Sequence, residues 1–163
     1  MIKKLVFLFI AILAVSCFND SKNSENVNPI GLWGKNPWPE IRNKRINTLL
    51  PKALKNANVD CWIVICRENN NDPLAEHIGG ENAGGTAVFL FYNDSKGFHS
   101  LVFSPSGEAT ALDELDIHHK VIPVDRAVSA VAMAAEFVKN QQFDTIAINS
   151  STGNSMADGF SFT

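Results

Sequence analysis

The stretch that decides the fold is CWIVIC, residues Cys61–Cys66. It is an unbroken apolar run of strand length, and no polar residue alternates with the apolar ones. Such a run is typical of a β-strand that is covered on both faces of a sheet. Its two cysteines are five positions apart, so they lie on opposite faces, about 16 Å from each other, too far apart for a disulfide. We interpret both as small buried apolar residues.

A helix is predicted before this strand. Trp38-Pro39-Glu40 begins it, because proline suits a first helical turn. Residues at a spacing of three and four then continue to Ala57, as in an amphipathic helix, and Ile41, Arg42, Arg45 and Ile46 belong to this pattern. Pro51 predicts a kink or a break.

Two strands and a hairpin are predicted after the long segment 67–85. Residues Thr86–Tyr92 and Phe98–Phe103 are strand-like, and Asn93–Gly97 between them is a turn signal, so the two strands should be antiparallel. Glu108–Leu115 predicts a short helix, and His119–Val124 predicts a fourth strand.

The last two predicted elements are a helix and a strand. Asp125 is the expected cap of a helix over Arg126–Asn140, and Asp144–Asn149 is the expected fifth strand. The residues expected to face the core from this helix are Val128, Val131, Ala132, Ala135, Phe137 and Val138. The order of elements predicts an α/β domain with a mixed sheet of five or more strands and helices on both faces.

The first residues have the pattern of an export signal. Lys3 and Lys4 precede an apolar run, Leu5–Val15, that is too short to span a bilayer. The run ends in Ala14-Val15-Ser16-Cys17, which resembles a bacterial lipoprotein box. We therefore expect a signal peptide over residues 1–16 and lipidation of Cys17, with ordinary secretion or a retained anchor as the alternatives.

A polar segment follows the expected signal. Residues 17–32 are rich in Asn and Ser and predict a flexible tether. Residues 33–155 then form one domain of ordinary size. The formal net charge of the chain is −3 and its basic residues are scattered, which argues against nucleic-acid binding. The expected location is a bacterial periplasm or outer membrane, with a lipid anchor as the membrane contact.

Candidate site residues lie after the first strand. Arg67 and Glu68 follow it directly, where site residues are common. The polar segment beyond carries Asp72, Glu76, His77 and Glu81, without a recognised zinc spacing. We expect solvated side chains that form an interface or the edge of an active site, and we predict no catalytic and no metal-ligating residue in this chain.

A cofactor loop is a weaker interpretation. Ser150-Ser151-Thr152-Gly153-Asn154-Ser155 follows a predicted strand and resembles the FMN phosphate loop of flavodoxins. Such a loop needs a helix behind it whose N-terminus faces the phosphate. Met156–Thr163 contains Gly159 and is too short for a stable helix, so we do not favour a flavin.

Three stretches together resemble a metallopeptidase group. They are WPEIRNKRINTLLPKALKNANVDCWIVICRE (Trp38–Glu68), ICRENNNDPLAEHIGGENAGGTAVFLFY (Ile65–Tyr92) and DTIAINSSTGNSMADGFSFT (Asp144–Thr163). In this order they are similar to the start of the aminopeptidase P, prolidase and creatinase family, in its secreted bacterial members. The resemblance covers nearly all of the expected mature chain, although each motif alone is only moderately specific.

The resemblance implies a function for the domain. It implies a ribonuclease H-like creatinase N-terminal domain that precedes a larger catalytic domain. Two divalent metals (Mn, Zn or Co) would be held there by two Asp, one His and two Glu, and N-terminal residues would be released from peptides, often before proline. Ala157-Asp158-Gly159 matches the segment leading to that domain, so residues 156–163 would begin the junction to a missing catalytic domain and this chain alone would be inactive.

The resemblance also implies that such a domain assists oligomerisation and shapes access to an active site. The expected partners are therefore the catalytic domain and other copies of the chain. The alternative is a stand-alone exported binding or scaffold module with the same fold.

Overall fold

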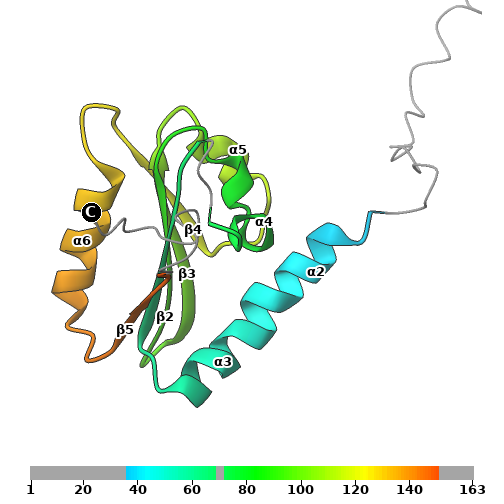
Figure 1. Cartoon of the computed structure of the whole chain (residues 1–163), viewed down its shortest axis with the longest axis vertical. Helices are drawn as coiled ribbons and strands as arrows, with labels where there is room; N and C mark the ends of the chain where they lie inside the picture. Colours follow the sequence, from blue (N-terminus) through cyan, green and yellow to red (C-terminus); the bar gives the residue numbers. More distant parts are fainter. Residues whose placement is uncertain (1–35, 69–71, 151–163) are drawn as a thin grey trace, which may run out of the picture. The chain divides into compact units, whose positions relative to one another are not determined.

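The computed structural model describes residues 36–68 and 72–150 (Figure 1). The expected signal peptide, Cys17, the tether and the expected junction at residues 156–163 lie outside these ranges. So do both ends of the predicted domain, 33–35 and 151–155, and most of the Ser150–Ser155 loop. These predictions stay predictions.

Within the described residues, five strands form one mixed sheet in the order β4-β3-β2-β1-β5. The central strand β1 (Cys61–Cys66) pairs antiparallel with β2 (Ala87–Asp94) and parallel with β5 (Ile146–Ile148). The next strand, β3 (Gly97–Pro105), pairs antiparallel with β2 and parallel with β4 (Lys120–Val124). The predicted α/β class and the mixed five-stranded sheet are confirmed.

The hairpin between β2 and β3 is also confirmed. Asp94 lies opposite Gly97 at its tip, and the Asp94 carboxylate accepts hydrogen bonds from the backbone N–H groups of Lys96 and Gly97 at 2.7 and 3.1 Å. Gly97 has a φ of 123°, which residues with a Cβ rarely adopt. Since β1, β3, β4 and β5 all run in one direction, their carboxyl ends meet at one end of the sheet.

The helical segment before β1 does not break at Pro51. It comprises α2 (Trp38–Lys44), a π-helical turn, η1 (Arg45–Leu49), and α3 (Leu50–Ala57). Pro51 lies in the first turn of α3, immediately after the π-helical turn. A π turn widens the helix locally, so the missing N–H of a proline is accommodated without ending it. Of the predicted kink or break, the break is therefore wrong, whereas the kink stays a prediction.

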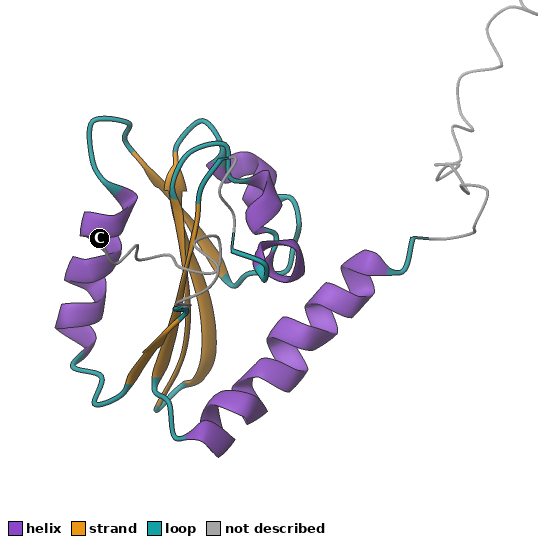
Figure 2. Ribbon diagram, in the orientation of Figure 1, coloured by secondary structure: helices purple, strands orange, loops and turns teal. Residues whose placement is uncertain are grey.

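Helices lie on both faces of the sheet (Figures 1 and 2). One face carries α2, η1 and α3, together with α4 (Ala75–Ile78), a 3₁₀ turn, η2 (Gly80–Asn82), and α5 (Ala109–Asp113). We call it the α2 face, and its core includes Val64, Phe89 and Phe91. The other face, the α6 face, is packed by α6 (Ala130–Gln141), and its core includes Ile65 and Leu90.

The start of α6 differs from the prediction. The helix begins at Ala130, and its cap is Ser129, whose hydroxyl accepts the N–H of Ala132 at 3.3 Å. Asp125 instead closes a separate turn by accepting the N–H of Ala127 at 2.8 Å. Val128 lies outside the helix and is 48% exposed, so its predicted place in the core is wrong. The most buried residues of α6 are Ala130 and Ala134 rather than Ala132 and Ala135.

Strand β5 is fastened at its start by one carboxylate. Asp60 accepts the N–H groups of Asp144 and Thr145, both at 2.9 Å. These bonds and the Thr145 hydroxyl hold the pKa of Asp60 below its ordinary value, because they stabilise the charged form. Beyond this anchor, Ile146 and Ile148 are 47% and 45% exposed, so the expected cover of both faces is incomplete at β5.

Candidate functional site

A cleft of about 640 Å³ lies at the carboxyl end of the sheet. Arg67 contributes to it immediately after β1, and Pro105 and Val124 contribute from the ends of β3 and β4. We call it the strand-end cleft. Its other lining residues lie just before β2, just before α5, and between β4 and the first turn of α6. They are Gly85, Thr86, Glu108, Asp125, Arg126, Val128, Ser129, Ala130 and Val131.

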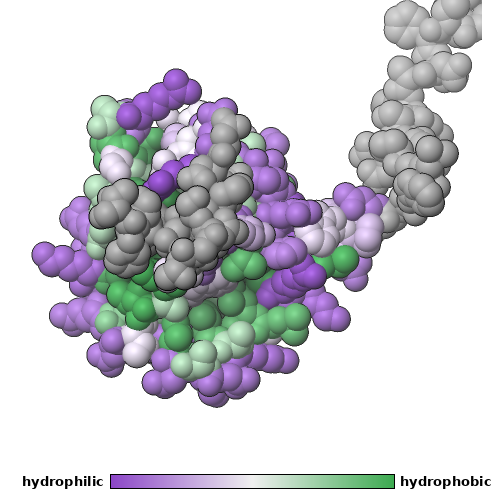
Figure 3. Space-filling view, viewed as in Figure 1, coloured by the Kyte–Doolittle hydropathy of each residue, from purple (hydrophilic) through white to green (hydrophobic). Residues whose placement is uncertain are grey.

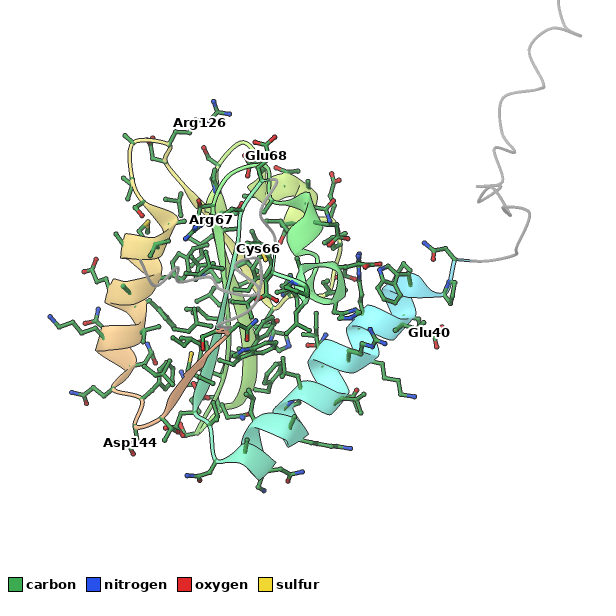
Figure 4. All side chains as sticks on the ribbon, in the orientation of Figure 1. Glu40, Cys66, Arg67, Glu68, Arg126 and Asp144 are labelled. Carbon is green, nitrogen blue, oxygen red and sulfur yellow. The ribbon has the colours of Figure 1, made fainter. Side chains whose placement is uncertain are left out.

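Local contacts position the charged groups of the strand-end cleft. The Glu108 carboxylate accepts the N–H of Gly85 at 2.8 Å, which joins the residue before α5 to the segment before β2. Arg126 lies so close to Gly107 that a Cβ added there would be 3.1 Å from its Nη2 atom. Arg126 projects outward from the loop before α6, and Arg67 lies nearer the sheet (Figure 4).

The chemistry available in this cleft is that of recognition. Two guanidinium groups, Arg67 and Arg126, stand beside two carboxylates, Glu108 and Asp125. The first N–H groups of a helix have no partner within the helix, and α6 begins at the cleft. Groups of both signs and hydrogen-bond donors suit a polar ligand or a polar edge of another domain. Glu68 follows Arg67 in a turn and is exposed.

Arg42 fastens the segment after β1 to α2. Its side chain is 9% exposed, its Nε donates to the carbonyl oxygen of Glu76 at 2.8 Å, and its Nη2 pairs with the carboxylate of Glu81. A largely buried guanidinium needs such partners, since an unpaired buried charge is costly. The Glu81 carboxylate therefore has a structural partner within the chain.

A stacked group surrounds this pair. The guanidinium carbons of Arg42 and Arg45 lie 5.3 and 5.4 Å from the centre of the Trp38 ring. Arg45 also contacts His77, with 2.8 Å between Nη1 and Nδ1, and the His77 ring is 5.7 Å from that of Trp38. Cations over an aromatic face are attracted by its quadrupole. His77 is thus held against α2.

Asp72 joins the same segment to β5. It is 4% exposed, one carboxylate oxygen accepts the N–H of Leu74 at 2.8 Å, and the other accepts the side-chain amide of Asn149 at 2.7 Å. Asn149 in turn accepts the indole N–H of Trp62 at 2.8 Å. The chain of contacts ties β1, β5 and the segment after β1 together.

The predicted site residues are therefore not gathered at one centre. Arg67 lines the strand-end cleft, while Glu76, His77 and Glu81 contact α2 or η1 and Asp72 contacts Asn149, just after β5. The expectation of solvated side chains is wrong for Asp72, which is buried. Among residues 36–68 and 72–150, no three His, Cys, Asp or Glu side chains gather closely enough to hold a metal ion.

Burial keeps two thiols and one imidazole, those of Cys61, Cys66 and His118, in their neutral form at neutral pH. Burial raises the pKa of Cys61 and of Cys66 to about 12, so both thiols stay protonated at neutral pH, as the sequence predicted for inert core cysteines. Burial also lowers the pKa of His118 to about 4. Its Nε2 lies 2.8 Å from the carbonyl oxygen of Ile78, and its ring packs against Phe89 and Phe91.

Sequence reasoning missed several structural roles. Arg42 lies four residues before the buried Ile46, so it shares the apolar face of its helix. A charged residue on that face was the signal for a buried ion pair, which the structure shows with Glu81. Ser129 and Glu108 had no comparable signal, because their partners depend on the tertiary fold.

In the part of the chain that the structure describes, no helix is long and apolar enough to cross a membrane. No model of a known protein family matches this chain, and no curated protein matches it significantly.

Proposed function

We propose that this chain is the non-catalytic N-terminal domain of a metallopeptidase of the aminopeptidase P, prolidase and creatinase type. The observation that carries the proposal is the mixed sheet, in which β1, β2 and β3 form a meander and β5 returns parallel to β1. A ribonuclease H-like mixed sheet is what the sequence resemblance implies. The agreement between motif order and topology supports the proposal.

The chemistry of peptide hydrolysis belongs, in this proposal, to the following domain. Metal ions in such enzymes lower the pKa of a bound water and polarise the peptide carbonyl. The described residues offer no group of three potential ligands, so they do not fit such a centre and we assign them no step. Their proposed role is to support the catalytic domain, its oligomerisation and access to its site.

The strand-end cleft is the part of the domain best suited to that role. Arg67 and Arg126 present guanidinium groups at the end of the sheet, with Glu108 and Asp125 beside them. Charged groups at a domain edge steer and orient a partner more than they add affinity. The segment 72–83, by contrast, is fastened to α2 and β5 and serves as a rigid support.

A second candidate is a stand-alone exported module that binds a polar ligand. The volume of the strand-end cleft, about 640 Å³, favours it, since small-molecule sites commonly have this size. In both cases we propose export with a lipid on Cys17.

The coding sequence downstream of the Thr163 codon separates the two candidates. The first candidate predicts an in-frame or frameshifted segment encoding a catalytic domain with two Asp, one His and two Glu ligands. An authentic stop codon followed by an unrelated gene would contradict it and favour the stand-alone module. Mass spectrometry of the membrane fraction tests the anchor: a diacylglyceryl group is expected on Cys17, and an unmodified N-terminus would contradict it.

A further inference from the structure

A second, smaller cavity lies on the α6 face, at the end of β3 and β4 opposite the strand-end cleft. Its volume is about 330 Å³. His99 and Lys120 line it near the start of these two strands, and we call it the His99 cavity. The exposed apolar surface that Figure 3 shows between α6 and α3 lies at β5, which contributes no residue to this cavity.

Tyr92 brings a buried hydroxyl group to the His99 cavity. The residue is 8% exposed, and its ring stacks on that of His99, with 4.8 Å between the centroids. In the part of the chain that the structure describes, no group forms a hydrogen bond with the Tyr92 hydroxyl. Burial raises the pKa of Tyr92, so the hydroxyl stays protonated at neutral pH. A buried tyrosine usually has a hydrogen-bond partner, and the cavity is the place where this one can find it.

Hydrogen bonds determine where the protons lie on two histidine rings of the cavity. The backbone N–H of Ser100 donates to Nδ1 of His119 at 3.1 Å, so the neutral His119 ring carries its proton on Nε2. The Asp94 carboxylate lies 2.9 Å from Nε2 of His99, and that nitrogen carries a proton because a carboxylate only accepts. The same carboxylate binds the backbone of the hairpin turn. His119 therefore offers a donor at Nε2, and Nδ1 of His99 remains for a further contact.

Lys120 adds a positive charge to these donors. It is exposed, and it pairs with no carboxylate among residues 36–68 and 72–150. The Tyr92 hydroxyl, the His119 Nε2–H group and the Lys120 ammonium group thus line one cavity. The rest of the wall is apolar and consists of Leu101, Ile122 and Phe137. An apolar wall with a few polar groups is typical of a small-molecule site.

We propose that the His99 cavity binds a small organic carboxylate with an apolar tail. The carboxylate accepts hydrogen bonds from Tyr92, His119 and Lys120, and bonds between charged groups of this kind are the stronger ones. The tail packs against the apolar wall. Ligand sites commonly measure about 300–1,000 Å³, so this cavity suits a molecule of roughly amino-acid size. The proposal does not depend on the function of the strand-end cleft.

The test titrates the purified chain with isocaproate and follows the ring signals of His99 and His119 by NMR. Both rings should shift in a saturable way with a Kd below about 1 mM. Isohexanol lacks the charge and inorganic phosphate lacks the tail, so each should bind at least about tenfold more weakly. No saturable shift with isocaproate would overturn the proposal. Equal affinity for isohexanol or for phosphate would contradict the class of ligand.

Three variants show whether the cavity itself is the binding site. Tyr92→Phe keeps the ring and removes the hydroxyl, and Lys120→Gln removes the charge, so each should weaken isocaproate binding about three- to tenfold. Lys139→Gln is the matched control, because it removes an exposed lysine of α6 that does not line the cavity, and it should change the affinity by less than about twofold. Unchanged affinity in Tyr92→Phe, or equal losses in the two lysine variants, would overturn the proposal.

Discussion

The two faces of the sheet are held in different ways. The α2 face contains buried polar groups that bind across elements: Arg42 with Glu81, Asp72 with Asn149, and His118 with the Ile78 carbonyl. The α6 face is packed almost entirely by apolar side chains under one helix, and it is uncovered at β5. The stability of the α2 face therefore depends on charged and hydrogen-bonded pairs that need a defined geometry. The stability of the α6 face depends on the apolar area that it buries.

This difference separates residues that hold the domain together from residues that are open to contacts. Four of the six candidate site residues, Asp72, Glu76, His77 and Glu81, make contacts within the domain that hold the segment 72–83 in place. The strand-end cleft, by contrast, is lined in part by the start of α6 and so adjoins the α6 face. Contacts with other chains or domains are therefore expected on that side.

The largest expected effect tests whether both faces carry core packing. Phe89 and Leu90 are adjacent, fully buried and on opposite faces. Phe89→Ala should cost about 3–5 kcal/mol and Leu90→Ala about 2–5 kcal/mol of unfolding free energy, because each leaves a cavity. Denaturant titration measures both. A loss below 1 kcal/mol for either variant would mean that its face is not a packed core.

The next effect isolates the pH dependence of the α2 face. The pKa of His118 falls from its ordinary value of 6.5 to about 4 in the folded chain, because burial disfavours the charged ring. The unfolded chain therefore takes up a proton first, and about 3 kcal/mol of stability should be lost as pH falls from about 6.5 to 4.

The control for this effect replaces the adjacent histidine. Unfolding free energies between pH 7 and pH 4 should flatten in His118→Gln and keep their slope in His119→Gln, whose ring is exposed. If both variants keep the same slope of unfolding free energy against pH, His118 is not the source of the pH dependence.

A smaller effect tests the Arg42 pair. Arg42→Ala leaves the Glu76 carbonyl and the Glu81 carboxylate without this partner and should cost about 1–3 kcal/mol. Arg45→Ala, on an exposed residue of the same helix, is the matched control and should cost less than about 1 kcal/mol. Equal losses would show that stacking on Trp38, rather than the buried pair, holds the segment.

The smallest effect concerns the α6 face. Ser129→Ala removes the cap of α6 and should cost about 1 kcal/mol. Asp125→Ala should cost less, because Asp125 closes a turn before the helix. Thermal unfolding ranks the stabilities of the two variants. A larger loss of stability for Asp125→Ala would mean that Asp125 caps the helix and that the helix begins at Arg126, as the sequence predicted.

The sequence predicted elements with strong local signals. The run Cys61–Cys66 and the turn at Asn93–Gly97 determine strand and hairpin through residues that are close in the chain. The start of α6 was misplaced because Asp125 and Ser129 are both good caps, and the packing of Ala130 and Ala134 decides between them. The burial of Asp72 was not predictable, since its partner Asn149 is 77 positions away.

Peptidase activity tests the central claim most directly, which is that this domain supports catalysis without performing it. The chain alone and the chain joined to its downstream coding sequence would be assayed on a peptide with proline in second position, with Mn²⁺, Zn²⁺ or Co²⁺. We predict metal-dependent release of the first residue by the joined protein and none by the chain alone. Metal-dependent turnover by purified chain 17–163 would contradict the account.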